Sequence, residues 1–370
     1  MKISMNITRP AALILLLAGI TMASCNKNIP DPTPINYPTP TGSSIAELLN
    51  DPNFSYLQAA VTRVGLLAPL SDKNTKFTVF APDNNAFNNL FTALGLPANI
   101  ATVGALPIAT LTAILQYHVV PGSVLSSTMI PESYPNTNMP TLLAASGTNP
   151  LLKFVNFPSR RGGSAFVDNV PVAAANIVAA NGVVHRMAGV IMPPNTNTLA
   201  QGLAADTSMT FLMAAVTRAD GGMPNGSKFS QLLSTPSPYA NFTLFAPNNN
   251  AFRALYRAFG VPEQASSINL FTVNTAVSIV AYHLHIAGVT TTATGASPQL
   301  IRVFSPNLPT TPTQATSFLS VLSPTAPRLT VNASQGVKGT GNATYSAIIA
   351  TDRHFLNGVY HVINQVLIPQ

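Results

Sequence analysis

His283 and His285 are the two side chains whose spacing comes closest to that of a metal site. On a strand, residues two apart share one face, so both imidazoles could contact one zinc ion. No third ligand is evident nearby in the sequence. In the internal repeat described below, Val120 takes the place of His285, so only half of the duplicated chain would carry the site. We therefore predict that the protein binds no metal.

Residues that could perform catalysis are equally sparse. The sequence has no Gly-x-Ser-x-Gly turn for a nucleophilic serine and no phosphate-binding glycine loop, and its single cysteine lies in the leader. The 11 acidic residues are spread thinly, and none forms a pair matched between the repeats. A carboxylate pair of the glycosidase kind stays open, because spacing alone does not exclude it. We predict that the protein is not an enzyme and uses no cofactor.

The charge pattern argues against nucleic acid as a partner. Charged residues make up only 8% of the 370 residues, so Asn, Thr, Ser and Gln must supply most of the surface polarity. Without Lys2 and Arg9 of the leader, 16 basic residues stand against 11 acidic ones, and Arg160-Arg161 is the single basic doublet. No Lys/Arg-rich run that could follow a phosphate backbone is present.

The first 25 residues have the pattern of a lipoprotein leader. A basic start precedes an apolar run at residues 11–20, which is about half the length that crosses a bilayer as a helix and is typical of a signal peptide. The segment "MASC" that ends at Cys25 resembles the bacterial lipobox, with Met22 in place of the commoner Leu. We predict that residues 1–24 are removed and that Cys25 is acylated, the alternative being an incidental thiol. Several acyl chains would hold the protein stably on a membrane.

Residues 25–43 are predicted to be a spacer. Five prolines between positions 30 and 40 favour an extended chain that cannot pack a core. At about 3.1 Å per residue it would reach roughly 50 Å from the membrane. Asn26 follows the cysteine where Asp is linked to inner-membrane retention in some bacteria, so we expect attachment to the outer membrane of the cell envelope.

The rest of the chain contains one unit twice. "FTVFAPDNNAF" at residues 77–87 returns as "FTLFAPNNNAF" at residues 242–252. Three further blocks return in the same order: residues 59–63 and 214–218, Tyr117-His118 and Tyr282-His283, and residues 181–193 and 357–369. We predict one domain at residues 44–194, a linker at 195–202 and a second domain at 203–370. The spacings place an insertion in the second copy, for which "GGMPNGSKFS" at residues 221–230 is the predicted loop.

Helical and strand patterns follow one another in each copy. In the first copy, apolar spacing predicts a helix around residues 54–64, and "KFTVFAP" predicts a strand that Pro82 ends. Asp83 or its neighbours can cap the next helix. The apolar face of that helix would consist of Phe87, Leu90, Phe91 and Leu94.

The second half of each copy has strand patterns. A further helical stripe ends near His118, and four strand-like segments follow it. Between the last two lies Asn181-Gly182, a strong signal for a tight hairpin. Helices first and strands later predict an α+β fold rather than a doubly wound sheet.

These blocks together resemble the fasciclin domain family. The residues that carry the resemblance are Phe80, Ala81, Pro82, Asn85, Phe87, Asn181, Gly182 and His185 in the first copy, and Phe245, Ala246, Pro247, Asn250, Phe252, Asn357, Gly358 and His361 in the second. The resemblance covers residues 44–370. It implies an α+β fold of two tandem fasciclin-like domains, each a β-wedge or sandwich with flanking helices. Family members are extracellular or cell-surface modules, often linked to adhesion and not usually enzymes.

The resemblance also singles out the Tyr-His pairs. In animal relatives this region is implicated in adhesion, which makes Tyr117, His118, Tyr282 and His283 candidate partner contacts. The alternative that we favour for the histidines is a structural role with hydrogen bonds to the backbone. The Asn-rich stretches are interpreted as helix caps.

Two functions remain open. The first is a non-enzymatic, lipid-anchored envelope protein that binds protein, matrix or glycan, with two copies adding avidity. The alternative is an accessory that captures an oligosaccharide or lipid for an uptake system. In that case Phe154, Phe157 and Phe166 could line an apolar cleft, although their strand positions favour a place in the core.

Overall fold

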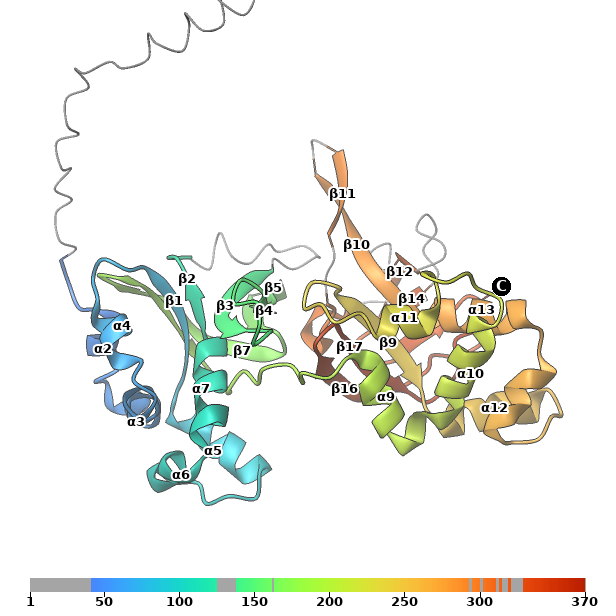
Figure 1. Cartoon of the computed structure of the whole chain (residues 1–370), viewed down its shortest axis with the longest axis horizontal. Helices are drawn as coiled ribbons and strands as arrows, with labels where there is room; N and C mark the ends of the chain where they lie inside the picture. Colours follow the sequence, from blue (N-terminus) through green and yellow to red (C-terminus); the bar gives the residue numbers. More distant parts are fainter. Residues whose placement is uncertain are drawn as a thin grey trace, which may run out of the picture. The chain divides into compact units, whose positions relative to one another are not determined.

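The computed structural model describes residues 41–124, 138–161, 163–292, 295–299, 302–310, 313–314, 319–320 and 329–369. The chain from Pro40 to Gln370 forms one compact unit that contains both copies of the repeat (Figure 1). The predicted signal peptide, the lipid attachment at Cys25 and the prolines of the spacer lie outside the described residues, so they stay predictions.

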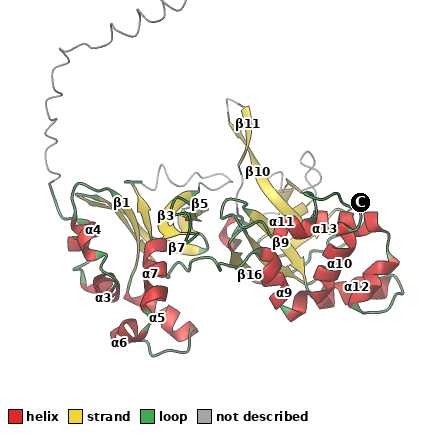
Figure 2. Ribbon diagram, in the orientation of Figure 1, coloured by secondary structure: helices red, strands yellow, loops and turns green. Residues whose placement is uncertain are grey.

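The first copy contains both helices and strands (Figure 2), and along the chain its helices precede most of its strands. Its elements are α2 (Ile45–Leu48), η1 (Pro52–Phe54), α3 (Ser55–Arg63), α4 (Leu67–Ser71), β1 (Phe77–Pro82), α5 (Asn84–Ala93), α6 (Ile100–Ala105), α7 (Ile108–Tyr117), β2 (Val119–Pro121), β3 (Met139–Ala144), β4 (Lys153–Asn156), β5 (Pro158–Arg161), β6 (Ser164–Val167), β7 (Val170–Ala179) and β8 (Gly182–Met187).

The second copy repeats this order. Its elements are α9 (Leu199–Ala205), η2 (Thr207–Met209), α10 (Thr210–Asp220), α11 (Phe229–Leu233), β9 (Phe242–Pro247), α12 (Asn249–Ala258), η3 (Ala265–Leu270), α13 (Val273–His283), β10 (Leu284–Thr292), β11 (Gly295–Gln299), η4 (Ser305–Asn307), β12 (Thr313–Gln314), β13 (Leu319–Ser320), β14 (Leu329–Asn332), β15 (Gly336–Gly339), β16 (Ile348–Phe355) and β17 (Gly358–Ile363). The first helix, α9, begins inside the segment predicted as a linker.

Each copy is built around a mixed sheet. In the first copy the strand order is β2-β1-β8-β7-β6-β5, and β1 lies parallel to β8. In the second copy the order is β11-β10-β9-β17-β16, and β9 lies parallel to β17. The strand that precedes the capped helix therefore pairs with the last strand of the same copy. The α+β prediction is confirmed.

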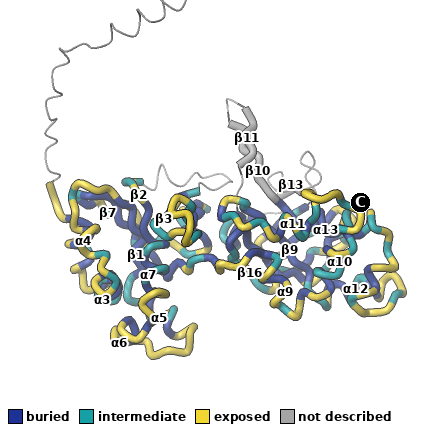
Figure 3. The backbone as a smooth tube through the Cα atoms, viewed as in Figure 1, coloured by how far each residue is buried: buried dark blue, intermediate teal, exposed yellow. Residues whose placement is uncertain are grey.

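The repeated strand is buried on both of its faces. Phe77, Val79 and Ala81 share one strand face, which packs into the core that the helices form. Phe80 packs on the opposite side, in a second apolar cluster. Thr78 is also buried and donates a hydrogen bond to the Gly122 carbonyl at 2.7 Å. The alternation of apolar and polar residues therefore does not mark a solvent-facing side (Figure 3).

The joint between β1 and α5 forms as the sequence predicts, with one correction. Asp83 is the N-cap, and its carboxylate accepts a hydrogen bond from the Ala86 amide at 2.9 Å. Phe87 and Phe91 are buried, whereas Leu94 is 54% exposed. The prediction that Leu94 belongs to the apolar face was wrong because α5 ends at Ala93.

The hairpin prediction is confirmed, and the loop predicted at residues 221–230 is correct except at its last two residues, which are helical. Strands β7 and β8 form a hairpin in which Ala179 pairs with Gly182. Residues 221–228 are loop, and α11 begins at Phe229, where Asp220 accepts hydrogen bonds from the Phe229 and Ser230 amides. Within the described residues, no single helix has the length and apolar character to span a membrane. One bent pair, Leu199–Ala205 with Thr207–Asp220, passes by length and composition only.

Candidate functional site

The histidines of the two Tyr-His pairs occupy equivalent buried positions. His118 follows α7, and its Nδ1 bonds the Ile114 carbonyl at 2.7 Å while its Nε2 accepts from the Ile191 amide at 2.9 Å. His283 makes the same two bonds, to the Ile279 carbonyl and from the Leu367 amide. These partners place the proton on Nδ1 and leave neither nitrogen for a metal. Burial lowers the pKa of each imidazole to about 4.

The tyrosines of the pairs are buried too, but their surroundings differ. The single hydroxyl proton of Tyr117 is shared between Asp168 Oδ2, at 2.9 Å, and the Val155 carbonyl, at 3.0 Å. The Tyr282 hydroxyl instead accepts from the Thr340 amide at 3.0 Å. Tyr117 is 0% exposed and Tyr282 is 4% exposed. Contact between these pairs and a partner stays a prediction, and their burial favours the structural alternative.

The Asn-Gly turn ties the ends of each copy together. Asn181 Oδ1 accepts from the Ile45 amide at 2.7 Å, and its Nδ2 donates to the Leu70 carbonyl at 2.8 Å. Asn357 makes the matching bonds to Leu199 and Leu233. The next residue must be glycine, because a Cβ on Gly182 would collide with the Phe77 carbonyl.

We expect Asn181→Ala to lower the free energy of unfolding by about 2–3 kcal/mol, because it leaves buried backbone groups without partners. Asn357→Ala should have a similar effect in the second copy. Urea denaturation of both variants measures this loss. The matched control is Asn85→Ala, at an exposed position, which should stay within about 0.5 kcal/mol of the parent. Equal midpoints for Asn181→Ala and Asn85→Ala would contradict the assignment.

The late histidines hold a bulge in the neighbouring strand. His361 Nε2 bonds the Val303 carbonyl at 2.8 Å, and its Nδ1 accepts from the Asp352 amide at 3.3 Å. His185 bonds the Val124 carbonyl and the Asn176 amide in the same way. Asp352 and Asn176 have φ of 59° and 62° and lie where the strand register shifts. These histidines therefore hold the bulged strand of the hairpin through its backbone.

The paired asparagines anchor a neighbouring helix rather than their own. Asn84 Oδ1 accepts from the Tyr56 amide at the start of α3, and Asn249 Oδ1 accepts from the Phe211 amide at the start of α10. Their own helices are capped by Asp83 and Asn248. Asn85 and Asn250 are exposed. The interpretation of these stretches as helix caps is therefore right for Asn248, while Asn84 and Asn249 bond the first turn of another helix.

The remaining motif residues are core. Strand residues Phe80, Ala81, Phe245 and Ala246 and helix residues Phe87 and Phe252 are 0–1% exposed, and Pro82 and Pro247 end their strands in buried positions. Phe154 and Phe157 are also core, at 3% and 0% exposed. Phe166, on β6, is half-buried, so the core alternative holds for Phe154 and Phe157 only. None of the three lines the pocket described next.

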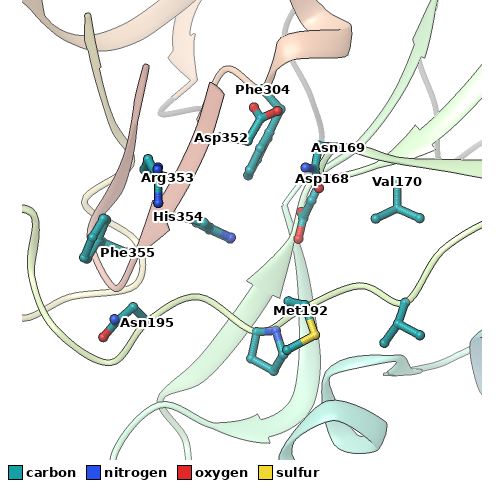
Figure 4. Close-up of a pocket in the computed structure, with 12 residues that line it drawn as sticks. Asp168, Asn169, Val170, Met192, Asn195, Phe304, Asp352, Arg353, His354 and Phe355 are labelled. Carbon is teal, nitrogen blue, oxygen red and sulfur yellow. The ribbon is translucent and has the colours of Figure 1, made fainter. Parts of the chain in front are cut away.

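A pocket of about 560 Å³ opens where residues of both copies meet (Figure 4). Its lining is Asp168, Asn169, Val170, Val190, Met192, Pro193 and Asn195 from the first copy and the segment after it, and Phe304, Asp352, Arg353, His354 and Phe355 from the second. Backbone bonds hold this junction, since the Asn195 amide donates to the His354 carbonyl and the Leu356 amide to the Asn197 carbonyl, both at 3.0 Å.

Arg302 is buried at the junction of the two copies. Its guanidinium is 1% exposed and donates to Asn241 Oδ1 at 3.1 Å and to the carbonyls of Pro238, Phe355 and Leu356. It also lies 5.2 Å from the ring centroid of Phe157 in the first copy. Burial lowers its pKa to about 10, which leaves it charged at neutral pH. Arg302 therefore joins the two copies through a cation–π contact.

His354 contacts Arg302 and also lines the pocket. Arginine can only donate, so the 2.7 Å contact between Arg302 Nη1 and His354 Nε2 makes Nε2 an acceptor and places the proton on Nδ1. Within the described residues, nothing accepts a hydrogen bond from this Nδ1. Figure 4 shows His354 and Asp168 facing the same space. The pocket therefore offers at least one unused N–H donor.

Asp168 and Asp352 bring two carboxylates to the pocket, but both are occupied. Asp168 accepts from the Phe157 amide at 2.9 Å and from Tyr117, and burial raises its pKa to about 7. Asp352 accepts from the Ser305 amide at 2.8 Å and from the Ser305 hydroxyl. Among the described residues, no group of three His, Cys, Asp or Glu side chains could hold a metal ion. The arrangement is suited to binding by hydrogen bonds.

Sequence reasoning missed the residues of this junction. Asp168, Arg302 and His354 occur in one copy only, so a repeated motif does not reveal them. The position of Asp168, 13 residues before the Asn-Gly turn, is Thr344 in the second copy. The signal that could have found these residues is the difference between the copies.

Comparisons with known proteins point to one family. The family model described as Fasciclin domain matches residues 52–193 and 225–369. Protein sll1483 of Synechocystis sp. is 34% identical over 143 residues, which are 38% of this chain and 68% of that protein. Transforming growth factor-beta-induced protein ig-h3 of Sus scrofa is 31% identical over 161 residues, which are 42% of this chain but only 20% of that longer protein. A solved FAS1 domain pair from the insect cell adhesion molecule fasciclin I has 18% identity and a TM-score of 0.33, and the match covers 85% of this chain and 95% of that one.

Proposed function

The chain belongs to the fasciclin domain family in both of its copies, and from this premise we propose that it is a non-enzymatic, lipid-anchored protein of the cell envelope that binds a protein, matrix or glycan ligand. The observation that carries the proposal is the match of two successive segments to the fasciclin model, behind a leader that ends in Cys25. Two binding units on one tether raise the effective concentration of the second contact once the first has formed.

The buried motif residues support a binding role over catalysis. The imidazoles of His118, His283, His185 and His361 each use both ring nitrogens in hydrogen bonds to the backbone, so they hold the fold rather than a substrate. A catalytic base must be within reach of the proton that it removes. The residues left for recognition are those at the surface and around the junction pocket.

A cell-attachment assay tests the role and the anchor together. We expect cells that lack the protein to attach less well than the parent cells to the surface that the parent cells colonise. Expression of the full chain should restore attachment. The variant Cys25→Ser should be made but not retained on membranes, because acylation needs the thiol, and it should fail to restore attachment. Fractionation of membranes and incorporation of a labelled fatty acid check the first part. Equal attachment with and without the protein would contradict the adhesion role.

The junction pocket favours a second candidate function, the capture of a small ligand. Its volume of about 560 Å³ lies within the range of about 300–1,000 Å³ that is usual for ligand sites. The oligosaccharide or lipid accessory role therefore remains the alternative, with the pocket between the copies as its site instead of the phenylalanines first considered.

A further inference from the structure

We propose that the pocket at the junction of the two copies binds a neutral oligosaccharide. This inference rests on the proposed binding function and specifies its ligand. The pocket needs both copies, because one wall carries Asp168 and Asn169 and the other carries Arg353 and His354 (Figure 4). Neither copy alone would present this set of groups.

The polar groups around the pocket match the hydroxyls of a sugar. His354 presents the Nδ1–H donor, and Asn169 and Asn195 are exposed and bring amide donors. Arg353 also lines the pocket, and its guanidinium interacts electrostatically with Asp206 as well. Asn169 also brings an amide oxygen that accepts. A sugar hydroxyl both donates and accepts, so it can pair with each of these groups. A lipid chain would leave them desolvated and unpaired, which costs free energy.

Apolar atoms lie among these polar groups. Val170 and Phe355 are half-buried, and Met192 is 45% exposed at the rim. The C–H faces of a sugar ring can cover such atoms while its hydroxyls reach the polar groups around them. Ligand sites commonly combine an apolar lining with a small number of convergent polar groups.

The charges select against strongly ionic ligands. Arg353 is in the wall and Arg302 lies behind His354, whereas Asp352 brings a carboxylate to the same space. Charges of both signs therefore stand close together, with no cluster of one sign that would attract a polyanion or a polycation. A neutral sugar meets hydrogen-bonding groups here without having to replace an ion pair.

Titration calorimetry on the full chain in detergent tests the inference. The probes are hexasaccharides of glucose, xylose and mannose as neutral sugars and oligogalacturonate as the anionic one. We expect at least one neutral hexasaccharide to bind, and Asn169→Ala and Arg353→Ala each to weaken it at least tenfold. Both variants alter exposed side chains, one in each copy, and Asn85→Ala is the exposed control that should bind as the parent does.

Each outcome of the calorimetry either supports or overturns the proposal that the pocket binds a neutral oligosaccharide. Binding that is lost in both pocket variants and kept in Asn85→Ala supports the proposal. Binding of oligogalacturonate alone, binding that the pocket variants leave unchanged, or no binding of any probe overturns it. The attachment assay reads the proposed function independently, since cells can attach through another surface of the protein while every hexasaccharide fails to bind.

Discussion

Arg302→Ala is expected to lower the free energy of unfolding by about 4 kcal/mol, the largest loss foreseen for a single side chain of this protein. Arg302 is 1% exposed, and its donors serve Asn241, His354 and three backbone carbonyls. Alanine would leave these acceptors buried without partners and would open a void beside Phe157. The measurement is urea denaturation, monitored by circular dichroism.

Two further variants make the Arg302 prediction specific. Arg302→Lys keeps a positive charge but has only three donors and no planar fork, so it should lie between the parent and the alanine variant. Arg353→Ala removes an exposed guanidinium one residue from His354 and should change stability by no more than about 0.5 kcal/mol. An unfolding midpoint for Arg302→Ala within error of the parent would contradict the structural role.

Acid is expected to unfold the protein over a pH range in which most domains are still stable. The sequence contains six histidines, and burial lowers the pKa of every one of them. The folded protein keeps these imidazoles neutral, whereas the unfolded chain protonates them near pH 6.5. The stabilisation is therefore complete above pH 6.5 and is lost as the pH falls toward the folded pKa, about 4 for His118 and His283.

The size of the acid effect follows from the number of protons. Each neutral histidine contributes a slope of about 1.4 kcal/mol per pH unit below pH 6.5. Asp168 opposes them, because its raised pKa of about 7 lets the folded state bind a proton before the unfolded chain does. The six histidines outweigh this one group. Unfolding free energies measured between pH 7.5 and 4.5 should fall steeply below pH 6.5.

A histidine variant distinguishes protonation of the buried histidines from other causes of acid denaturation. His283→Gln is less stable at neutral pH, because it disturbs the bonds to Ile279 and Leu367. Its stability should nevertheless decline less steeply with acid, by about 1.4 kcal/mol per pH unit, since one titrating group is gone. A parent protein whose stability is flat from pH 7 to pH 5 would overturn this account.

The repeated residues made much of the fold predictable from the sequence. Three elements were predicted correctly because each has its own local sequence pattern. They are the strand that ends at Pro82, the helix that Asp83 caps and the Asn181-Gly182 hairpin. The end of α5 was misplaced, since Leu94 continues the apolar spacing after the helix has stopped.

The junction could not be predicted in the same way. Arg302 and Phe157 are 145 residues apart in the sequence, and no local pattern links them. His354 lies on a strand whose spacing shows nothing of Arg302 beneath it. Residues that meet only through the packing of the two copies have no periodic pattern in the sequence. The sequence therefore does not predict which residues line the pocket.

The parallel pairing of early and late strands has a consequence for how the chain folds during its synthesis. The first helix of each copy is bonded to the Asn-Gly turn just before the last strand, across 136 residues in the first copy and 158 in the second. Such contacts have a high contact order, and the copy cannot complete its sheet until its last strand has emerged. Each copy thus stays open during synthesis and closes only when its final hairpin has emerged.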